Sequence, residues 1–106
     1  MPELFEDSAM KAYLVGFFKI SDPKKYHSDY VEPVLKIIAK HGGHPLIVSD
    51  QCLNKEGHLP EGRFVVIEFP DMKTAETFYN DPEYLPYKPV RQALTHSTLA
   101  FVEGTA

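Results

Sequence analysis

The apolar positions divide the chain into segments with strand-like and helix-like spacing. Aromatic and β-branched residues crowd Ala12–Ile20 and Arg63–Phe69, a composition that is typical of strands. His44–Gln51 and Ser97–Glu103 are enriched in the same residue types. The residues from 52 to 62 carry Asn, Gly, Pro and charges, which indicates a loop. The pattern therefore predicts four strands, with this loop between the second and the third.

A helix is predicted between the first two strands. Asp22 can cap the free amides of its first turn, and Pro23 suits the first helical position because no hydrogen-bond partner is needed there. At about 100° per residue, the apolar side chains gather on one half of the helical wheel. Pro33 falls on the polar half, where we expect the helix to bend, and Gly42-Gly43 end the helix. The apolar half holds Tyr26, Ile37, Tyr30, His41, Val34, His27, Ile38, Val31 and Leu35.

The chain after the third strand is predicted to be helical but interrupted. Asp71 can cap a helix over Met72–Tyr79, where apolar residues recur at helical spacing. Asp81-Pro82 repeats the arrangement of a cap followed by proline. Pro86 and Pro89 then argue against one regular helix, so we expect broken turns and a final short helix around residues 90–94.

This order of elements, β-α-β-β-α-β, predicts a ferredoxin-like α+β domain. Two split βαβ halves place both helices on one face of an antiparallel four-stranded sheet. The domain is expected to occupy residues 11–104. Residues 1–10 show no periodicity and are interpreted as a flexible lead-in, and residues 105–106 as a tail.

Both faces of the predicted sheet are apolar. In the first strand, Tyr13, Val15 and Phe17 alternate with Leu14 and Phe18. A sheet with one solvated face would alternate apolar with polar residues instead. We therefore predict that a second copy of the chain covers the face that the helices leave open, giving a homodimer.

Charge and composition narrow the functions that need considering. The formal net charge is −4, and no basic run exceeds Lys24-Lys25, so nucleic-acid binding is not expected. The longest apolar run, from 12 to 18, is far shorter than the ~20 residues of a membrane-spanning helix. The acidic N-terminus has no apolar core, and Cys52 is the single cysteine, so we expect a cytoplasmic protein.

His27 is the first candidate for chemistry, because it lies in the middle of the apolar half of the wheel. A histidine facing the sheet, or the cleft between helix and sheet, could act as a general base. The alternative is a partly buried histidine whose ring is hydrogen-bonded to a backbone carbonyl. No acidic partner for it is identifiable in the sequence.

Glu68 is the second candidate, because it shares a face of the third strand with Phe64 and Val66. A carboxylate on an apolar face is costly unless it is paired. Arg63 has the opposite strand parity, so Arg91 is the favoured partner. The pair could anchor a ligand, or it could be an ion pair that orients the two subunits.

Tyrosines are the third group of candidates. Tyr26, Tyr30 and Tyr79, together with Arg91, could line a pocket for a flat ligand. The alternative is that these rings belong to the core. No cluster of Cys, His and acidic residues has the spacing of a zinc site, and no phosphate-binding loop, nucleophile elbow or redox pair is present. We therefore expect neither a metal nor a cofactor.

Several of these elements together resemble the domain-of-unknown-function family numbered 1330. The resemblance spans roughly residues 11–104 and implies a dimeric α+β barrel, with no established biochemical role. Related barrels include cofactor-independent monooxygenases, isomerases and haem enzymes, which is an analogy of fold. Pro86 and Pro89 depart from the family, in which that stretch is often helical. The matching elements are Asp22-Pro23 with Tyr26 and Tyr30, His41-Gly42-Gly43, Ile67-Glu68-Phe69-Pro70, Asp81-Pro82-Glu83-Tyr84 with Arg91, and Val102-Glu103-Gly104.

Three hypotheses follow. The chain could be a small-molecule-binding dimer that acts as a sensor, carrier or accessory factor. It could be a small enzyme that performs acid–base or oxygen chemistry without a cofactor, with His27 as the base and Arg91 steadying an anion. It could also be a purely structural dimer without a ligand.

Overall fold

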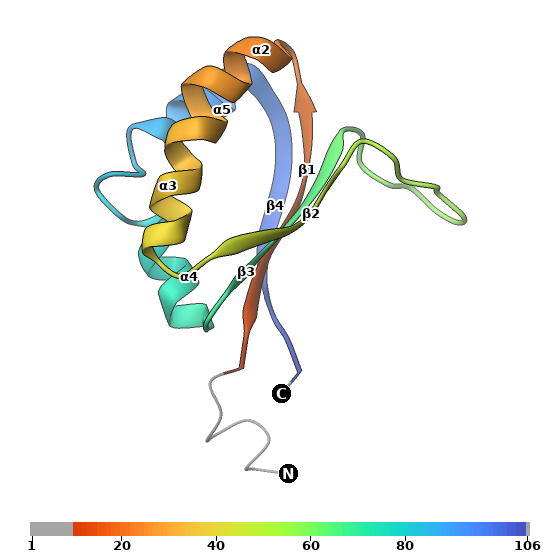
Figure 1. Ribbon diagram of the computed structural model, residues 1–106. Helices are drawn as coiled ribbons and strands as arrows, with labels where there is room; N and C mark the ends of the chain where they lie inside the picture. Colours follow the sequence, from red (N-terminus) through yellow and green to blue (C-terminus); the bar gives the residue numbers. More distant parts are fainter. Residues whose placement is uncertain (1–9, 106) are drawn as a thin grey trace.

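The computed structural model describes residues 10–105, which form a sheet covered by helices on one side (Figure 1). The predicted lead-in lies outside this range, except for Met10. The elements in chain order are β1 (Ala12–Ile20), α2 (Pro23–Tyr26), a π-helical turn η1 (His27–Val31), α3 (Glu32–Lys40), β2 (His44–Ser49), β3 (Arg63–Phe69), α4 (Met72–Tyr79), α5 (Tyr87–Leu94) and β4 (Thr95–Glu103).

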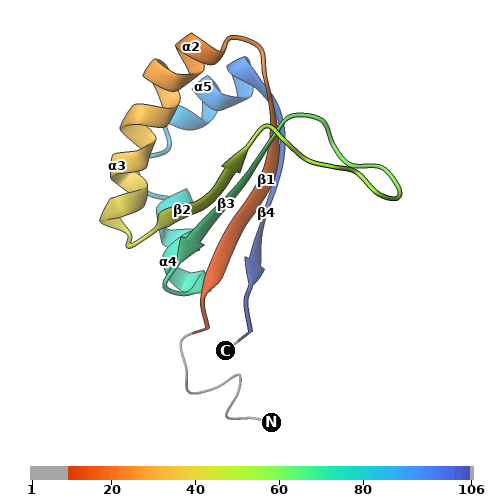
Figure 2. The same cartoon turned by 45° about the vertical axis from the view of Figure 1, so that its right-hand side comes forward.

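The sheet has the strand order β2-β3-β1-β4, and each neighbouring pair is antiparallel. The two long central strands, β1 and β3, pair with Leu14 opposite Ile67. All the helices lie on the same side of the sheet in both views (Figures 1 and 2). This architecture confirms the predicted ferredoxin-like α+β fold.

The long segment before β2 begins as predicted but contains an unexpected π turn. The Asp22 side chain accepts a hydrogen bond from the Lys25 backbone amide at 3.1 Å, which caps α2. Five residues later the helix widens, and the Glu32 amide bonds to the His27 carbonyl instead of the Ser28 carbonyl. Pro33 follows directly and has no N–H to donate. The helical segment runs without a break from 23 to 40. Within η1 the chain rotates by a smaller angle per residue than in an α-helix.

The prolines near the C-terminus interrupt the chain less than expected. We predicted a short helix from about residue 90, whereas α5 starts at Tyr87. Pro86 lies at the N-cap and Pro89 within the first turn, where backbone amides have no partner inside the helix. Neither proline therefore removes a hydrogen bond from α5. The strand that follows starts at Thr95, earlier than predicted.

The core lies between the sheet and the helices. Leu14, Phe18 and Phe69 are buried from the sheet side, and Val34 and Phe78 from the helix side. The Phe69 and Phe78 rings are 5.4 Å apart, within the range of favourable aromatic pairs. This contact holds α4 against β3.

The opposite face of the sheet carries half-buried and exposed apolar residues. Phe17 and Phe64 pair across β1 and β3, with ring centroids 5.0 Å apart. Ile47 and Val102 are 43% and 47% exposed. We call this surface the open face; its coverage by a second copy stays a prediction.

The predicted loop between β2 and β3 projects from the sheet on the side away from the helices (Figure 1). Its residues from 50 to 62 are all exposed. Ion pairs Arg63–Asp50, at 3.0 Å, and Lys19–Glu61, at 2.9 Å, tie its base to the sheet. Within residues 10–105, no helix has both the length and the apolar character needed to cross a membrane.

Candidate functional site

A cavity of about 110 Å³ lies between the sheet and the long helical segment. Its lining is mostly apolar and comes from all four strands and from the helices that cover them, with the largest shares from β3 and α3. Leu35 and Val48 line it and are 40% and 58% exposed, so they mark its mouth at the outer edge of α3 and β2. Other lining residues are Leu14, Phe18, Val34, Ile38, Val65 and Phe78.

The π turn sets the aromatic wall of the cavity. Tyr26 and Tyr30 are both buried and line the cavity, and their rings are stacked 5.0 Å apart at 11°. Because the chain rotates less per residue through η1, side chains four residues apart fall on one line along the helix. Tyr26, Tyr30 and Val34 therefore all face the sheet. Burial raises the pKa of Tyr26 to about 12 and raises that of Tyr30 as well, so both hydroxyls keep their protons at neutral pH.

Arg91 from α5 also lines the cavity and is 5% exposed. Its Nη1 donates a hydrogen bond to the Tyr84 hydroxyl at 3.1 Å, and that hydroxyl lies 2.7 Å from the Tyr30 hydroxyl. Burial raises the pKa of Tyr84 too, so the partner of Arg91 is a neutral phenol. Among residues 10–105, Arg91 Nε has no hydrogen-bond partner.

His27 does not face this cavity. Its side chain is 63% exposed and lies 3.5 Å from Glu32, also on the surface. The prediction that His27 faces the sheet assumed about 100° of rotation at every residue. The π turn starts at His27 itself and moves the buried line onto the two tyrosines. The imidazole is therefore outside the helix–sheet cleft.

Glu68 shares a face with Phe64 and Val66, as its strand parity predicted, and that face is the open one; the expected pairing with Arg91 is wrong. Arg91 is on the helix side of the sheet. Glu68 is instead surrounded by partners from its own face. They are the Tyr13 hydroxyl, which donates at 3.1 Å, His44 Nε2 at 3.2 Å and Lys11 Nζ at 3.7 Å. Glu68 and the cavity residues therefore belong to separate sites.

Tyr79, at the end of α4, lies beside the cavity residues but does not line the cavity. Its ring is 5.7 Å from that of Tyr84 and packs edge-on against Phe101 at 5.8 Å. Lys88 Nζ lies over the ring, 3.8 Å from its centroid. Tyr79 therefore packs against Tyr84, and its hydrogen bonding also raises the pKa of Arg91.

Tyr84 was not among the predicted site residues, although it connects Arg91 to Tyr30. It is 1% exposed and stands in the irregular stretch between α4 and α5. Asp81, three residues earlier, orders this stretch: its carboxylate accepts the Glu83 backbone amide at 2.8 Å. The Asp81-Pro82 pair was the sequence signal for that turn.

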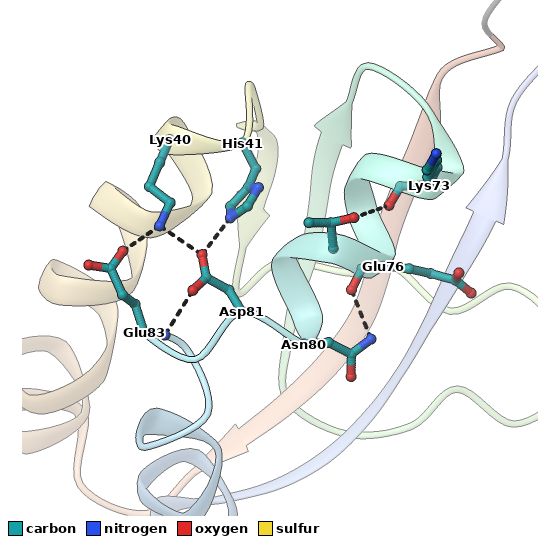
Figure 3. Close-up of polar contacts among 8 residues, drawn as sticks. Lys40, His41, Lys73, Glu76, Asn80, Asp81 and Glu83 are labelled. Atoms are coloured by element: carbon teal, nitrogen blue, oxygen red, sulfur yellow. Dashed lines mark hydrogen bonds and ion pairs between the residues drawn. The ribbon is translucent and has the colours of Figure 1, made fainter.

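A polar cluster fastens Asp81 to the end of α3 (Figure 3). His41 Nε2 lies 2.7 Å from the Asp81 carboxylate, and Lys40 Nζ lies 2.9 Å from it. The hydrogen bonds from His41 and Lys40 hold the pKa of the Asp81 carboxyl well below its usual range. The cluster therefore fixes the turn that carries Tyr84, and through it the position of Arg91.

The arrangement suits binding of an organic molecule better than binding of a metal. Within the described part of the chain, no group of three or more His, Cys, Asp or Glu side chains could hold a metal ion. The cavity offers apolar walls, stacked rings and hydrogen-bond donors from Arg91 and the Tyr30–Tyr84 pair, while Arg63, which also lines it, is bonded to Asp50. These features are typical of small-molecule sites.

Solved structures of low sequence identity share this fold. RPA0582, a protein of unknown function from Rhodopseudomonas palustris, matches with a TM-score of 0.74 and 16% identity, over 93% of this chain and 85% of that chain. SnoaB, a cofactor-independent oxygenase from Streptomyces nogalater, matches with a TM-score of 0.65 and 16% identity, over 91% and 94%. A conserved protein of unknown function from Bacteroides thetaiotaomicron matches with a TM-score of 0.61 and 14% identity, over 92% and 100%.

At these identities the likeness extends to the fold and not to the chemistry. No curated protein matches the chain. The family whose sequence pattern fits residues 11–105 is described as a domain of unknown function, DUF1330. Because that match covers nearly the whole chain, the protein belongs to the DUF1330 family.

Proposed function

We propose that this domain binds a small, flat molecule in the cavity between the sheet and the helices. The observation that carries the proposal is the cavity itself, about 110 Å³ of space in an otherwise packed core. Protein interiors leave few voids larger than a water molecule. An apolar cavity of about 150 Å³ is large enough to bind benzene. This cavity is smaller but opens at Leu35 and Val48, so a single aromatic ring is the largest flat group that suits it.

The test is binding of phenol by isothermal titration calorimetry to the wild type and to a plugged variant. Leu35→Trp places a large ring at the mouth and is expected to weaken phenol binding at least about tenfold. Lys36→Trp is the matched control, because Lys36 is the next residue of α3, is exposed and does not line the cavity. Absence of saturable binding to the wild type contradicts the proposal.

We also propose that the domain acts as a homodimer in which the open faces cover each other. The apolar side chains of that face and the loop projecting on the same side support this (Figure 1). Val15→Glu puts a charge in the centre of the face and is expected to give monomers in sedimentation velocity. Lys36→Glu, on the helix side, should leave the dimer intact. A wild-type monomer at ~micromolar concentration, a typical range for such interfaces, contradicts the proposal.

A cofactor-independent enzyme is the second candidate, favoured by the shared fold with SnoaB. Binding takes precedence because His27 lies on the surface and the tyrosines of the cavity keep their protons at neutral pH. The enzyme hypothesis predicts that a bound phenol or hydroquinone is turned over with consumption of oxygen. It also predicts that Tyr30→Phe lowers turnover more than affinity. A protein that only binds the ligand shows no turnover as the wild type or as Tyr30→Phe.

A further inference from the structure

The charge of Arg91 has no anionic partner. A guanidinium stays protonated at any physiological pH, and this one is 5% exposed. Among residues 10–105, no carboxylate lies within ion-pair distance of it. Its Nη1 donates a hydrogen bond to the hydroxyl of Tyr84, and hydrogen bonding with Tyr79 raises the pKa of Arg91 against the effect of burial, so its polar partners are phenols and not anions. A buried cation without a counter-charge is costly, and an anionic ligand would offset that cost.

Hydrogen-bond donors of Arg91 and of the Tyr30–Tyr84 pair have no acceptor within the described residues. The contact between the Tyr30 and Tyr84 hydroxyls uses one of their two protons, and neither oxygen makes a further bond beyond that from Arg91 within the described residues. Arg91 Nε–H is likewise unused. A group that complements this end of the cavity must therefore present two acceptors and a negative charge, as a carboxylate does.

A second arginine, Arg63, also lines the cavity, but it is paired with a carboxylate. Arg63 bonds Asp50 through Nε at 3.0 Å and through Nη2 at 3.3 Å. Its charge is thus already matched within the chain. Arg63 and Arg91 share the cavity and differ in having or lacking an anion, which makes Arg63 the natural control.

We propose that the cavity takes an aromatic monocarboxylate, with the carboxylate on Arg91 and Tyr30 and the ring among the apolar walls. This inference rests on the proposed function and names its ligand class. The cavity volume of about 110 Å³ limits the ring system to a single ring. Benzoate is the simplest probe of this class, and benzamide is its neutral counterpart of the same shape.

The experiment measures the affinities of benzoate and benzamide by calorimetry for three proteins. The wild type is expected to prefer benzoate by about ten- to a hundredfold, the range for hydrogen bonds to charged groups. Arg91→Met should remove this preference by weakening benzoate much more than benzamide, for which most of the binding comes from the ring contacts that remain. Arg63→Met should retain the preference, since the Arg63 charge is already paired with Asp50.

The outcomes distinguish binding in the cavity from a preference of the cavity for an anion. Equal binding of benzoate and benzamide to the wild type overturns the anion inference and leaves the cavity proposal standing. Binding of neither ligand, nor of phenol, overturns both. If Arg91→Met does not fold, Arg91→Lys keeps the charge without the planar guanidinium. That variant should retain part of the preference for benzoate, and a complete loss of preference would contradict a role for charge.

Discussion

Two charged residues, Glu68 and Arg91, lie on opposite faces of the same sheet and are treated differently by the fold. Glu68 on the open face is 17% exposed and is surrounded by Tyr13, His44 and Lys11. Arg91 on the covered face is more deeply buried, and its partners, Tyr84 and Tyr79, are phenols and not anions. The carboxylate is satisfied from within the chain, as structural polar groups normally are. The arginine is not, and that difference is the reason for assigning the ligand to the helix side.

The largest predicted effect is the loss of stability on replacing Phe18, compared with the loss on replacing its neighbour Phe17 on the other face of the sheet. Phe18 is 6% exposed on the covered face, so Phe18→Ala should cost about 3–5 kcal/mol of unfolding free energy at any protein concentration. Phe17 lies on the open face and is half-buried in one copy of the chain. Phe17→Ala should cost less at low protein concentration. It should also weaken the dependence of stability on concentration that a dimer shows.

Chemical denaturation at two protein concentrations checks this pair of variants. Equal costs for the two substitutions at both concentrations would mean that the faces are equivalent, and would contradict the proposed dimer interface.

The next effect has opposite signs on the two faces. Arg91→Met removes a buried charge that no described carboxylate neutralises and leaves the Tyr30–Tyr84 hydrogen bond in place, but it loses the contacts with Tyr79 and Tyr84, so it should stabilise the protein by only about 1 kcal/mol. Glu68→Gln keeps an acceptor for Tyr13 but loses its ion pairs, and should destabilise by about 0.5 kcal/mol. Thermal unfolding without ligand measures both. A clear loss of stability for Arg91→Met would mean that Arg91 is a structural residue.

The polar cluster behind the cavity predicts a dependence of stability on pH. The folded-state pKa of Asp81 is lowered by the hydrogen bonds from His41 and Lys40, so ionised Asp81 stabilises the fold above its unfolded pKa of about 4. This contribution is lost as the pH falls below about 4 towards the folded-state value.

Asp81→Asn should therefore lower stability at neutral pH and flatten the loss of stability in acid. Denaturation midpoints between neutral and acidic pH measure this, and Asp29→Asn is the control, because Asp29 is exposed and forms no ion pair among the described residues. Parallel pH profiles for the wild type and Asp81→Asn would contradict the role of the cluster.

The smallest effect concerns His27. Its side chain is on the surface and its contact with Glu32 is an exposed ion pair, so His27→Ala should change stability by less than about 0.5 kcal/mol. Affinity for phenol should not change either. A marked loss of affinity or of turnover in His27→Ala would mean that His27 takes part in ligand binding or catalysis.

The strands and their faces could be predicted from the sequence because period-two alternation is local. Ala12–Ile20 and Arg63–Phe69 were predicted with the boundaries that β1 and β3 have, and Glu68 was placed on its correct face. The partner of Glu68 was not predictable in this way. Parity shows the face of a strand residue, but it does not show on which side of the sheet a residue of α5 lies.

The helix side was harder to predict because it depends on one irregular turn. A uniform wheel put His27 in the middle of the buried arc, and the π turn at His27–Val31 moved the arc onto Tyr26 and Tyr30. The site role of Tyr84 was missed because its stretch has no periodicity. Its place depends on Asp81 bonding to His41, a contact across forty residues that no local pattern reveals.

The Nε–H of Arg91 reports most directly on the central claim, because it has no partner among residues 10–105. Its resonance can be followed by nuclear magnetic resonance in isotope-labelled protein during titration with benzoate. We expect a large saturable downfield shift of this signal with benzoate and a small one with benzamide, while the Arg63 signal hardly moves. An Arg91 signal that stays unchanged while benzoate saturates the protein would contradict the claim that this arginine holds the ligand.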